Sequence, residues 1–350
     1  MDRYIAVDAH LQSCTMAVVG PSGRRLKSQV VESNGRALVE AVRSVPGRRH
    51  VCLEEGTQSA WLYELLRPHA AEVVVTLPAK RQGPKDDVRD AWALAEELRS
   101  GALRTVVYKA PGRLGGLREA ARGYTMLSGD LVRVKNRLKA LYRSRGIVTD
   151  ARIYRAEGRE AWEHQLPESQ RRLATLLGGY LEAVEQAQGE AERWLREEAK
   201  RQTVIKMLAT APGLGWIRTA QLVAIVGTPE RFRTVRQFWS YCGLGIVTRS
   251  SSDWVREGQR WVRAQTIQTR GLNRNRHPLL KTIFKGAATT VIQQLVAHPL
   301  HQDYQRMLQA GIRPNLAKLT LAWRIAAAVL SMWKHQEEYD PQKHCRQQRA

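Results

Sequence analysis

Short apolar runs alternate with amphipathic stretches over roughly the first 110 residues, a pattern typical of strands joined to helices. Strands alternating with helices indicate an α/β layer with a mixed sheet. The predicted elements are a strand at 4–10, two strands within 14–33, a helix at 34–45, a strand, turn and helix within 50–69, a strand at 72–80, a helix within 83–101 that Gly101 closes, and a last strand at 104–111.

After residue 117 the apolar positions take up helical spacing. The stretch 117–201 is long and amphipathic, which predicts a helical hairpin or coiled coil. The stretch 203–333 is also mostly helical, and the residues after 336 are predicted to fray. The predicted fold class is therefore α/β and then mainly α. The expected domains are 1–115, a helical coiled-coil region at 116–201, a C-terminal domain at 202–335, and a tail at 336–350.

Positive charge is the strongest feature of the composition. Lys and Arg number 56 against 33 Asp and Glu, which gives a net charge of +23 and a pI near 10.4. A GC-rich genome would favour arginine over lysine, but it does not explain the excess over acids. A field of this sign favours a polyanion such as DNA, RNA or an anionic membrane.

The charge is also unevenly distributed. From Gly258 to Gln302 the chain has no acidic residue, whereas a solvated surface usually mixes signs. A one-signed stretch is better explained by a phosphate backbone nearby, and it predicts nucleic-acid contacts. The basic residues of this stretch are Arg260, Arg263, Arg270, Arg274, Arg276, Lys281 and Lys285.

The remaining bulk features favour a cytoplasmic protein. Cys14, Cys52, Cys242 and Cys345 are scattered, without the spacing of a metal site or a disulfide framework. The start of the chain lacks the basic and apolar segments of a secretory signal. The apolar stretch 319–333 is short and contains Arg324, so it makes a poor membrane span.

Acidic residues stand at the ends of predicted elements in the first domain. Asp8 ends the first strand, Glu54 and Glu55 end a later strand, and Asp87 and Asp90 lie on one face of a helix start, with Cβ atoms about 5–6 Å apart. Carboxylates gathered at one edge of a sheet would suit Mg²⁺ or Mn²⁺, and two such ions can serve phosphodiester chemistry. An Asp at a helix start, such as Asp86 or Asp87, is also a good N-cap without any metal.

The order of these acids resembles the DEDD-type insertion-sequence transposases, the RNA-bridged serine recombinases. The resemblance implies an RNase-H-like, RuvC-type first domain with four metal-binding acids, and a C-terminal transposase domain. It also implies double-stranded DNA as substrate, a non-coding guide RNA, and a homodimer or homotetramer. The matching positions are Asp8 in YIAVDAH, Glu55, Thr57 and Trp61 in LEEGTQSAWLYELL, and Asp87, Asp90 and Ala91 in KDDVRDA, with Glu54 as the alternative to Glu55.

A glycine-rich segment interrupts the second half at Pro212, Gly213 and Gly215. Backbone N–H groups in a helix–hairpin–helix of this kind can bind a phosphate, although an ordinary helix–helix turn would look the same. The transposases have Pro-Gly-x-Gly followed by Thr-Ala here, and Thr219 and Ala220 match that pattern.

The resemblance also points to a nucleophile. Tyr241-Cys242-Gly243-Leu244 matches the family, and counting on from Gly243 places the family's serine at Ser251, between Ser250 and Ser252. The family implies that this serine attacks the DNA and holds one strand as a phosphoserine. The sequence departs from the pattern by Ile246 in place of Pro and by Ser252 in place of Gly.

Three functions compete. The first is a bacterial, nucleoid-associated transposase that uses Asp8, Glu55, Asp87, Asp90 and Ser251 with Mg²⁺ or Mn²⁺. The second is a Holliday-junction-type endonuclease that uses the acids without a covalent intermediate. The third is a basic nucleic-acid-binding protein with idle acids. An adduct lost in Ser251→Ala separates the first two, and Asp87→Ala separates both from the third.

Overall fold

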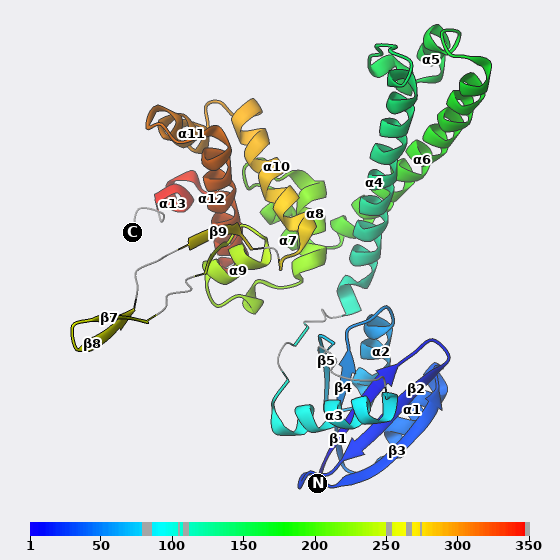
Figure 1. The fold of residues 1–350 in the computed structure, drawn as a ribbon, viewed down its shortest axis with the longest axis vertical. Coiled ribbons are helices and arrows are strands. Elements are labelled where there is room, and N and C mark those ends of the chain that lie inside the picture. The colour runs from blue at the N-terminus through cyan, green and yellow to red at the C-terminus, as the bar shows by residue number, and fades with distance from the viewer. Residues whose placement is uncertain are drawn as a thin grey trace. The chain divides into compact units, whose positions relative to one another are not determined.

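The computed structural model describes residues 1–78, 86–103, 106–107, 112–249, 254–263, 268–273 and 275–346. The chain forms two compact units, 1–112 and 113–350. Figure 1 shows a sheet with helices in the first unit and mainly helices in the second. The predicted order, α/β and then mainly α, is confirmed.

The first unit is built on a mixed sheet of five strands in the order β3-β2-β1-β4-β5. β1 pairs antiparallel with β2 and parallel with β4, and β4 continues parallel to β5. The strands are β1 (Asp2–Ala9), β2 (Ser13–Val19), β3 (Arg25–Glu32), β4 (Arg48–Glu54) and β5 (Glu72–Thr76).

Both faces of this sheet are covered. Along its central strands, the side chains that point to one face and those that point to the other face are both apolar. One face packs Ile5, Val7 and Leu53 against α1 (Gly35–Arg43) and α2 (Ser59–Leu66), which the short helix η1 (Arg67–His69) follows. The opposite face packs Ala6 and Cys52 against α3 (Asp87–Ser100). The alternation of side chains along a strand therefore decides which residues meet α3.

The predicted closure of α3 at Gly101 is confirmed. Gly101 adopts φ 70°, and its N–H bonds to the last turn of the helix. Of the predicted strand at 104–111, the structure describes Val106 and Val107. Val106 bridges antiparallel to Thr76, and the Val107 N–H donates to Val75 O at 2.6 Å.

The second unit begins with the predicted helical hairpin. Its arms are α4 and α6, and apolar residues at helical spacing, including Val134, Leu138 and Leu181, form a core between them. Buried Arg159 is held by Glu182 at 2.6 Å, and Gly178 leaves the room that its guanidinium occupies. The elements are η2 (Gly112–Leu114), α4 (Gly115–Arg143), η3 (Ala151–Tyr154), α5 (Ala156–Glu163) and α6 (Glu168–Lys200).

The rest of the second unit is a helical domain. Its longest helix, α12 (Pro314–His335), is long and apolar enough by composition to cross a membrane, but more than half of its most apolar window is buried within the protein. The half-buried rings of Trp239 and Trp323 stack on each other. The helices are α7 (Thr203–Leu208), α8 (Gly215–Val226), η4 (Pro229–Arg231), α9 (Val235–Tyr241), α10 (Pro278–Gln294), α11 (Pro299–Gln309) and α12 (Pro314–His335).

Four short strands interrupt this domain, where the sequence predicts mainly helix. β6 pairs with β9 and β7 pairs with β8, all antiparallel. Ile, Val, Thr and Trp recur in these segments, and β-branched and aromatic residues favour strands. The strands are β6 (Ile246–Arg249), β7 (Trp254–Glu257), β8 (Arg260–Arg263) and β9 (Gln268–Leu272).

The chain's last described residues form α13 (Pro341–Arg346), where the sequence predicts a frayed tail. The Asp340 carboxylate accepts from the Gln342 N–H at 2.8 Å, and Pro341 follows it. An Asp cap followed by Pro is a strong local start for a helix.

Candidate metal centre

Asp8 lies near the end of β1 on the face of the sheet that α3 covers. It follows Ala6 by two residues, and Ala6 packs with Leu94 and Ala95 of α3. Asp8 is 8% exposed, which is unusual for an ionisable residue. A carboxylate this deeply buried requires compensating hydrogen bonds or cations.

The first turn of α3 brings a second carboxylate to Asp8. Asp86 is the N-cap, and one of its oxygens accepts from the Val88 and Arg89 N–H groups, each at 3.1 Å. Asp87 is the first residue of α3. The packing of α3 on β1 and β2 places Asp87 near Asp8. The capping role therefore belongs to Asp86, and Asp87 is available for the site.

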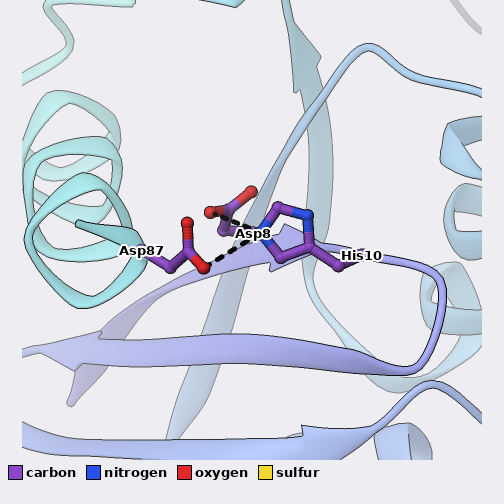
Figure 2. A group of neighbouring side chains, drawn as sticks. All are labelled: Asp8, His10 and Asp87. Atoms are coloured by element: carbon purple, nitrogen blue, oxygen red, sulfur yellow. Dashed lines mark ion pairs between the residues drawn. The ribbon is translucent and has the colours of Figure 1, made fainter. Parts of the chain in front are cut away.

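The imidazole of His10 faces both of these aspartates, as Figure 2 shows. Its Nε2 is 3.5 Å from Asp8 Oδ2 and 3.3 Å from Asp87 Oδ2. One potential ligand atom from each of the three residues lies within 4.8 Å of the others. His10 is not among the carboxylates predicted from the sequence, although histidine is a common metal ligand and His10 follows the strand-end Asp8 by two residues.

Glu54 is the last residue of β4 and Glu55 is the first residue after it. Val7 pairs with Leu53 in the parallel ladder of β1 and β4, so Asp8 and Glu54 are the next neighbours. Because Cys52 faces α3, Glu54 faces α3 as well. In agreement, burial first, and then the charges of Glu97 and Glu54, raise the pKa of Cys52 to about 12.

Glu55 continues the ladder beyond β4 and is held differently. Its N–H donates to Thr76 O at 2.7 Å, and its Oε2 accepts from Ser59 Oγ at 3.2 Å, at the start of α2. Both glutamates nevertheless line one cavity of about 350 Å³ with Asp8 and His10. The cavity is large enough for hydrated cations and a substrate phosphate.

Asp90 lies one helical turn after Asp87 and is half-buried. Within the part of the chain that the structure describes, the close group of ligand atoms consists of Asp8, His10 and Asp87. The structure thus brings together two of the four predicted acids with one unpredicted histidine. It also places both Glu54 and Glu55 at the cavity that Asp8 and His10 line.

The predicted nucleic-acid residues divide into three sets. Arg276, Lys281 and Lys285 lie together, since burial and then the charges of Arg276 and Lys285 lower the pKa of Lys281. Arg260, Arg263 and Arg270 lie on β8 and β9, and Arg260 is exposed. The residues that lie outside the described ranges are Arg274, Ser250, Ser251 and Ser252.

Gly213 lies in the turn between α7 and α8, and Gly215 is the first residue of α8. Gly213 has φ +74°, and a Cβ there would lie 2.3 Å from Ala287 O of α10, so close packing alone explains this glycine. Gly215 is exposed, with φ +59° and open space around it. Gly215 is therefore the glycine of this pair that a phosphate could approach.

The mixed sheet and the helices that cover it are consistent with the RuvC-like fold of the DEDD transposase class. The model of IS110-type DEDD transposases, described as "Transposase", matches residues 5–144. A second model, described as "Transposase IS116/IS110/IS902 family", matches residues 205–297. The y4pF/y4sB protein of Sinorhizobium fredii (strain NBRC 101917 / NGR234), whose name describes it as a transposase, is 26% identical over 289 residues. That match covers 79% of this chain and 68% of the relative.

The two models together match about two thirds of the chain, one in each unit. The chain belongs to the IS110 family of DEDD transposases. Membership implies DNA as substrate and the cutting and joining of DNA strands in transposition as the activity.

Proposed function

We propose that this transposase cuts and rejoins DNA at the ends of its own mobile element, with a divalent cation in the first unit and a serine nucleophile in the second. The observation that carries the proposal is the convergence of Asp8 and Asp87 with His10. Asp87 is far along the chain from Asp8 and His10, and the packing of α3 on the sheet brings the ligand atoms of the three residues within 4.8 Å of one another.

The donor set fits Mg²⁺ or Mn²⁺. Carboxylate oxygens suit both ions, and an imidazole nitrogen is a better ligand for Mn²⁺ than for Mg²⁺. Asp8, His10 and Asp87 would hold the ion. When bound, the ion stabilises charge on the attacking and leaving oxygens of a phosphodiester. The short distances between the ligand atoms support this assignment.

Two further acids would complete the site. Asp90 lies one turn along α3 from Asp87, as the family pattern expects. Of the two glutamates, we favour Glu54, because the strand turns it to the face that carries Asp8. Glu55 remains the alternative that the sequence motif prefers. Glu54→Gln and Glu55→Gln form a matched pair, and the loss of Mn²⁺ affinity in one of them identifies the ligand.

Ser251 is the proposed nucleophile. Its Oγ would release its proton and form a bond to phosphorus, the bond from phosphorus to the leaving oxygen would break, and that oxygen would take up a proton in turn. The reverse step with a new strand would rejoin the DNA. The support is the family match, whose second model covers the segment around this serine. The proposed partners are double-stranded DNA, a non-coding guide RNA, and further copies in a homodimer or homotetramer. The proposed location is the cytoplasm, at the nucleoid.

The test is strand exchange between labelled element ends and a target duplex, with Mg²⁺ and the RNA recovered from the purified protein. Asp87→Asn is expected to abolish exchange, whereas Asp86→Asn keeps a good N-cap and is expected to retain it. A covalent protein–DNA adduct that resists denaturation is expected in the wild type and absent in Ser251→Ala.

The competing functions give different results in the same assay. A junction endonuclease would cut without an adduct, and Ser251→Ala would still cut. A purely binding protein would show the same behaviour for Asp87→Asn as for the wild type. Removal of the RNA by ribonuclease is expected to stop exchange at the chosen target, and continued exchange would contradict the guide-RNA part of the proposal.

A further inference from the structure

The hairpin of β7 and β8 carries an unusual set of residues on one face. Its register pairs Arg256 with Trp261 and places residue 263 opposite Trp254. Because residues two apart on a strand, and residues directly opposite in an antiparallel pair, share a face, Trp254, Arg256 and Trp261 lie on the same side. The hairpin therefore presents two indoles with a guanidinium between them.

These indoles are strongly exposed. Trp254 is 59% exposed and Trp261 is 64% exposed, although tryptophan is usually well buried. Exposed aromatic rings beside an arginine indicate a surface that binds a ligand. The surface lies outside the metal centre and belongs to the other compact unit.

The charge around the two indoles indicates which kind of ligand binds to this face. Within the hairpin, Glu257 and its register partner Arg260 lie on the opposite face, so Arg256 gives the Trp face a positive charge. The chain then has no acidic residue until Asp303. An acyl chain or an apolar protein face would leave Arg256 without a partner, whereas a nucleic acid supplies bases for the indoles and phosphates for the guanidinium.

The spacing of the indoles favours unpaired bases. Diagonal neighbours on an antiparallel pair are about 7–8 Å apart. That separation is about twice the ~3.4 Å rise between stacked bases, so two indoles can flank a single base. In a duplex both faces of each base are covered by its neighbours, and a stacking surface finds no free face inside the helix.

We propose that this hairpin face is a stacking platform for unpaired bases of single-stranded nucleic acid. Trp254 and Trp261 stack on the bases, and Arg256 contacts the backbone. The inference goes beyond the proposed strand transfer and does not depend on it, because base stacking requires neither the metal nor Ser251. The unpaired bases can come from an RNA loop or from an opened DNA strand, which share this chemistry.

The experiment measures binding of the full chain, freed of nucleic acid and held in a metal chelator, to fluorescent oligonucleotides of about 16 nucleotides, the upper end of common site sizes. The probes are a single-stranded DNA, the RNA of the same sequence, the corresponding DNA duplex, and a single strand without bases. The DNA and RNA arms distinguish the two sources. The duplex and the baseless strand isolate stacking from phosphate attraction.

The variants separate stacking from folding. Trp254→Leu and Trp261→Leu keep an apolar side chain but lose the ring, and each is expected to weaken single-strand binding by about 5- to 100-fold. The same variants are expected to bind the duplex and the baseless strand within about twofold of the wild type. Trp254→Phe and Trp261→Phe keep a ring and are expected to recover most of the affinity.

The matched control is Trp194→Leu on α6, because Trp194 is 42% exposed and lies on a different element. It is expected to leave all four affinities unchanged. Equal losses for Leu and Phe, equal losses on the baseless strand, or no loss at all would each overturn the proposal. None of these results depends on strand exchange, so failure here leaves the proposed function standing.

Discussion

The two compact units carry different amounts of charge. Residues 1–112 contain 16 Lys and Arg against 13 Asp and Glu, and residues 113–350 contain 40 against 20. The first unit is therefore almost balanced, with acids gathered at one cavity, while the second carries nearly all of the positive excess. The comparison indicates a division of tasks between the units. The first unit supplies the chemistry, and the second unit supplies most of the contacts with nucleic acid.

The largest expected effect tests that division directly. Asp8→Asn removes the buried carboxylate at the centre of the metal site, and a bound metal is worth several kcal/mol to phosphodiester chemistry. Strand exchange is expected to fall on the order of 10³-fold. Duplex binding measured by anisotropy is expected to stay within about twofold, since the basic unit is untouched. A parallel loss of binding would show that the two units do not divide these tasks.

The second prediction concerns the stability of the basic unit. Gly213→Ala would force a Cβ to within 2.3 Å of Ala287 O at a residue with φ +74°. Overpacking and backbone strain together are expected to cost about 2–4 kcal/mol of unfolding free energy. Thermal unfolding should show a lower transition for the second unit. Gly215→Ala, where φ is +59° but the space is open, should cost less. Equal losses at the two glycines would contradict the packing role of Gly213.

The third prediction concerns the metal preference of the balanced unit. His10→Ala is expected to lower Mn²⁺ affinity by about 10-fold, the lower end of what even outer-shell partners contribute. The effect on Mg²⁺ should be smaller, because Mg²⁺ prefers oxygen ligands. Calorimetric titration measures both affinities. Spin-echo spectroscopy of bound Mn²⁺ should show nitrogen coupling in the wild type that His10→Ala lacks. Coupling that persists in His10→Ala would assign the nitrogen to another residue.

The smallest expected effect lies on α10. Lys281→Gln and Lys285→Gln each remove one cation from the cluster with Arg276, and each should reduce the slope of log affinity against log salt by about one. Lys27→Gln, an exposed lysine of β3 in the first unit, is the control and should leave the slope unchanged. A slope that responds equally to Lys27→Gln would place DNA contacts on both units.

Local patterns along the chain predicted most of the fold. The apolar runs of β1, β4 and β5, the closure of α3 by Gly101 and the amphipathic hairpin of α4 and α6 all follow from short-range periodicity and capping. The strands β6 to β9 were missed because each is four or five residues long. Such short runs carry little periodic signal beside the strongly helical segments around them.

The features of the candidate site also fall into two groups, those that local sequence patterns predict and those that depend on the tertiary structure. The sequence by itself determined that Asp8 ends a strand and that Asp87 begins a helix, because strand ends and caps are local features. Only the tertiary structure decided that Asp86 caps the helix while Asp87 turns to Asp8. It also decided that the imidazole of His10 faces both aspartates and that Glu54 shares their face. The physical reason is that these relations depend on how α3 packs across the sheet and on the register of β1 with β4. Both are contacts between segments remote in the chain, and no local pattern encodes them.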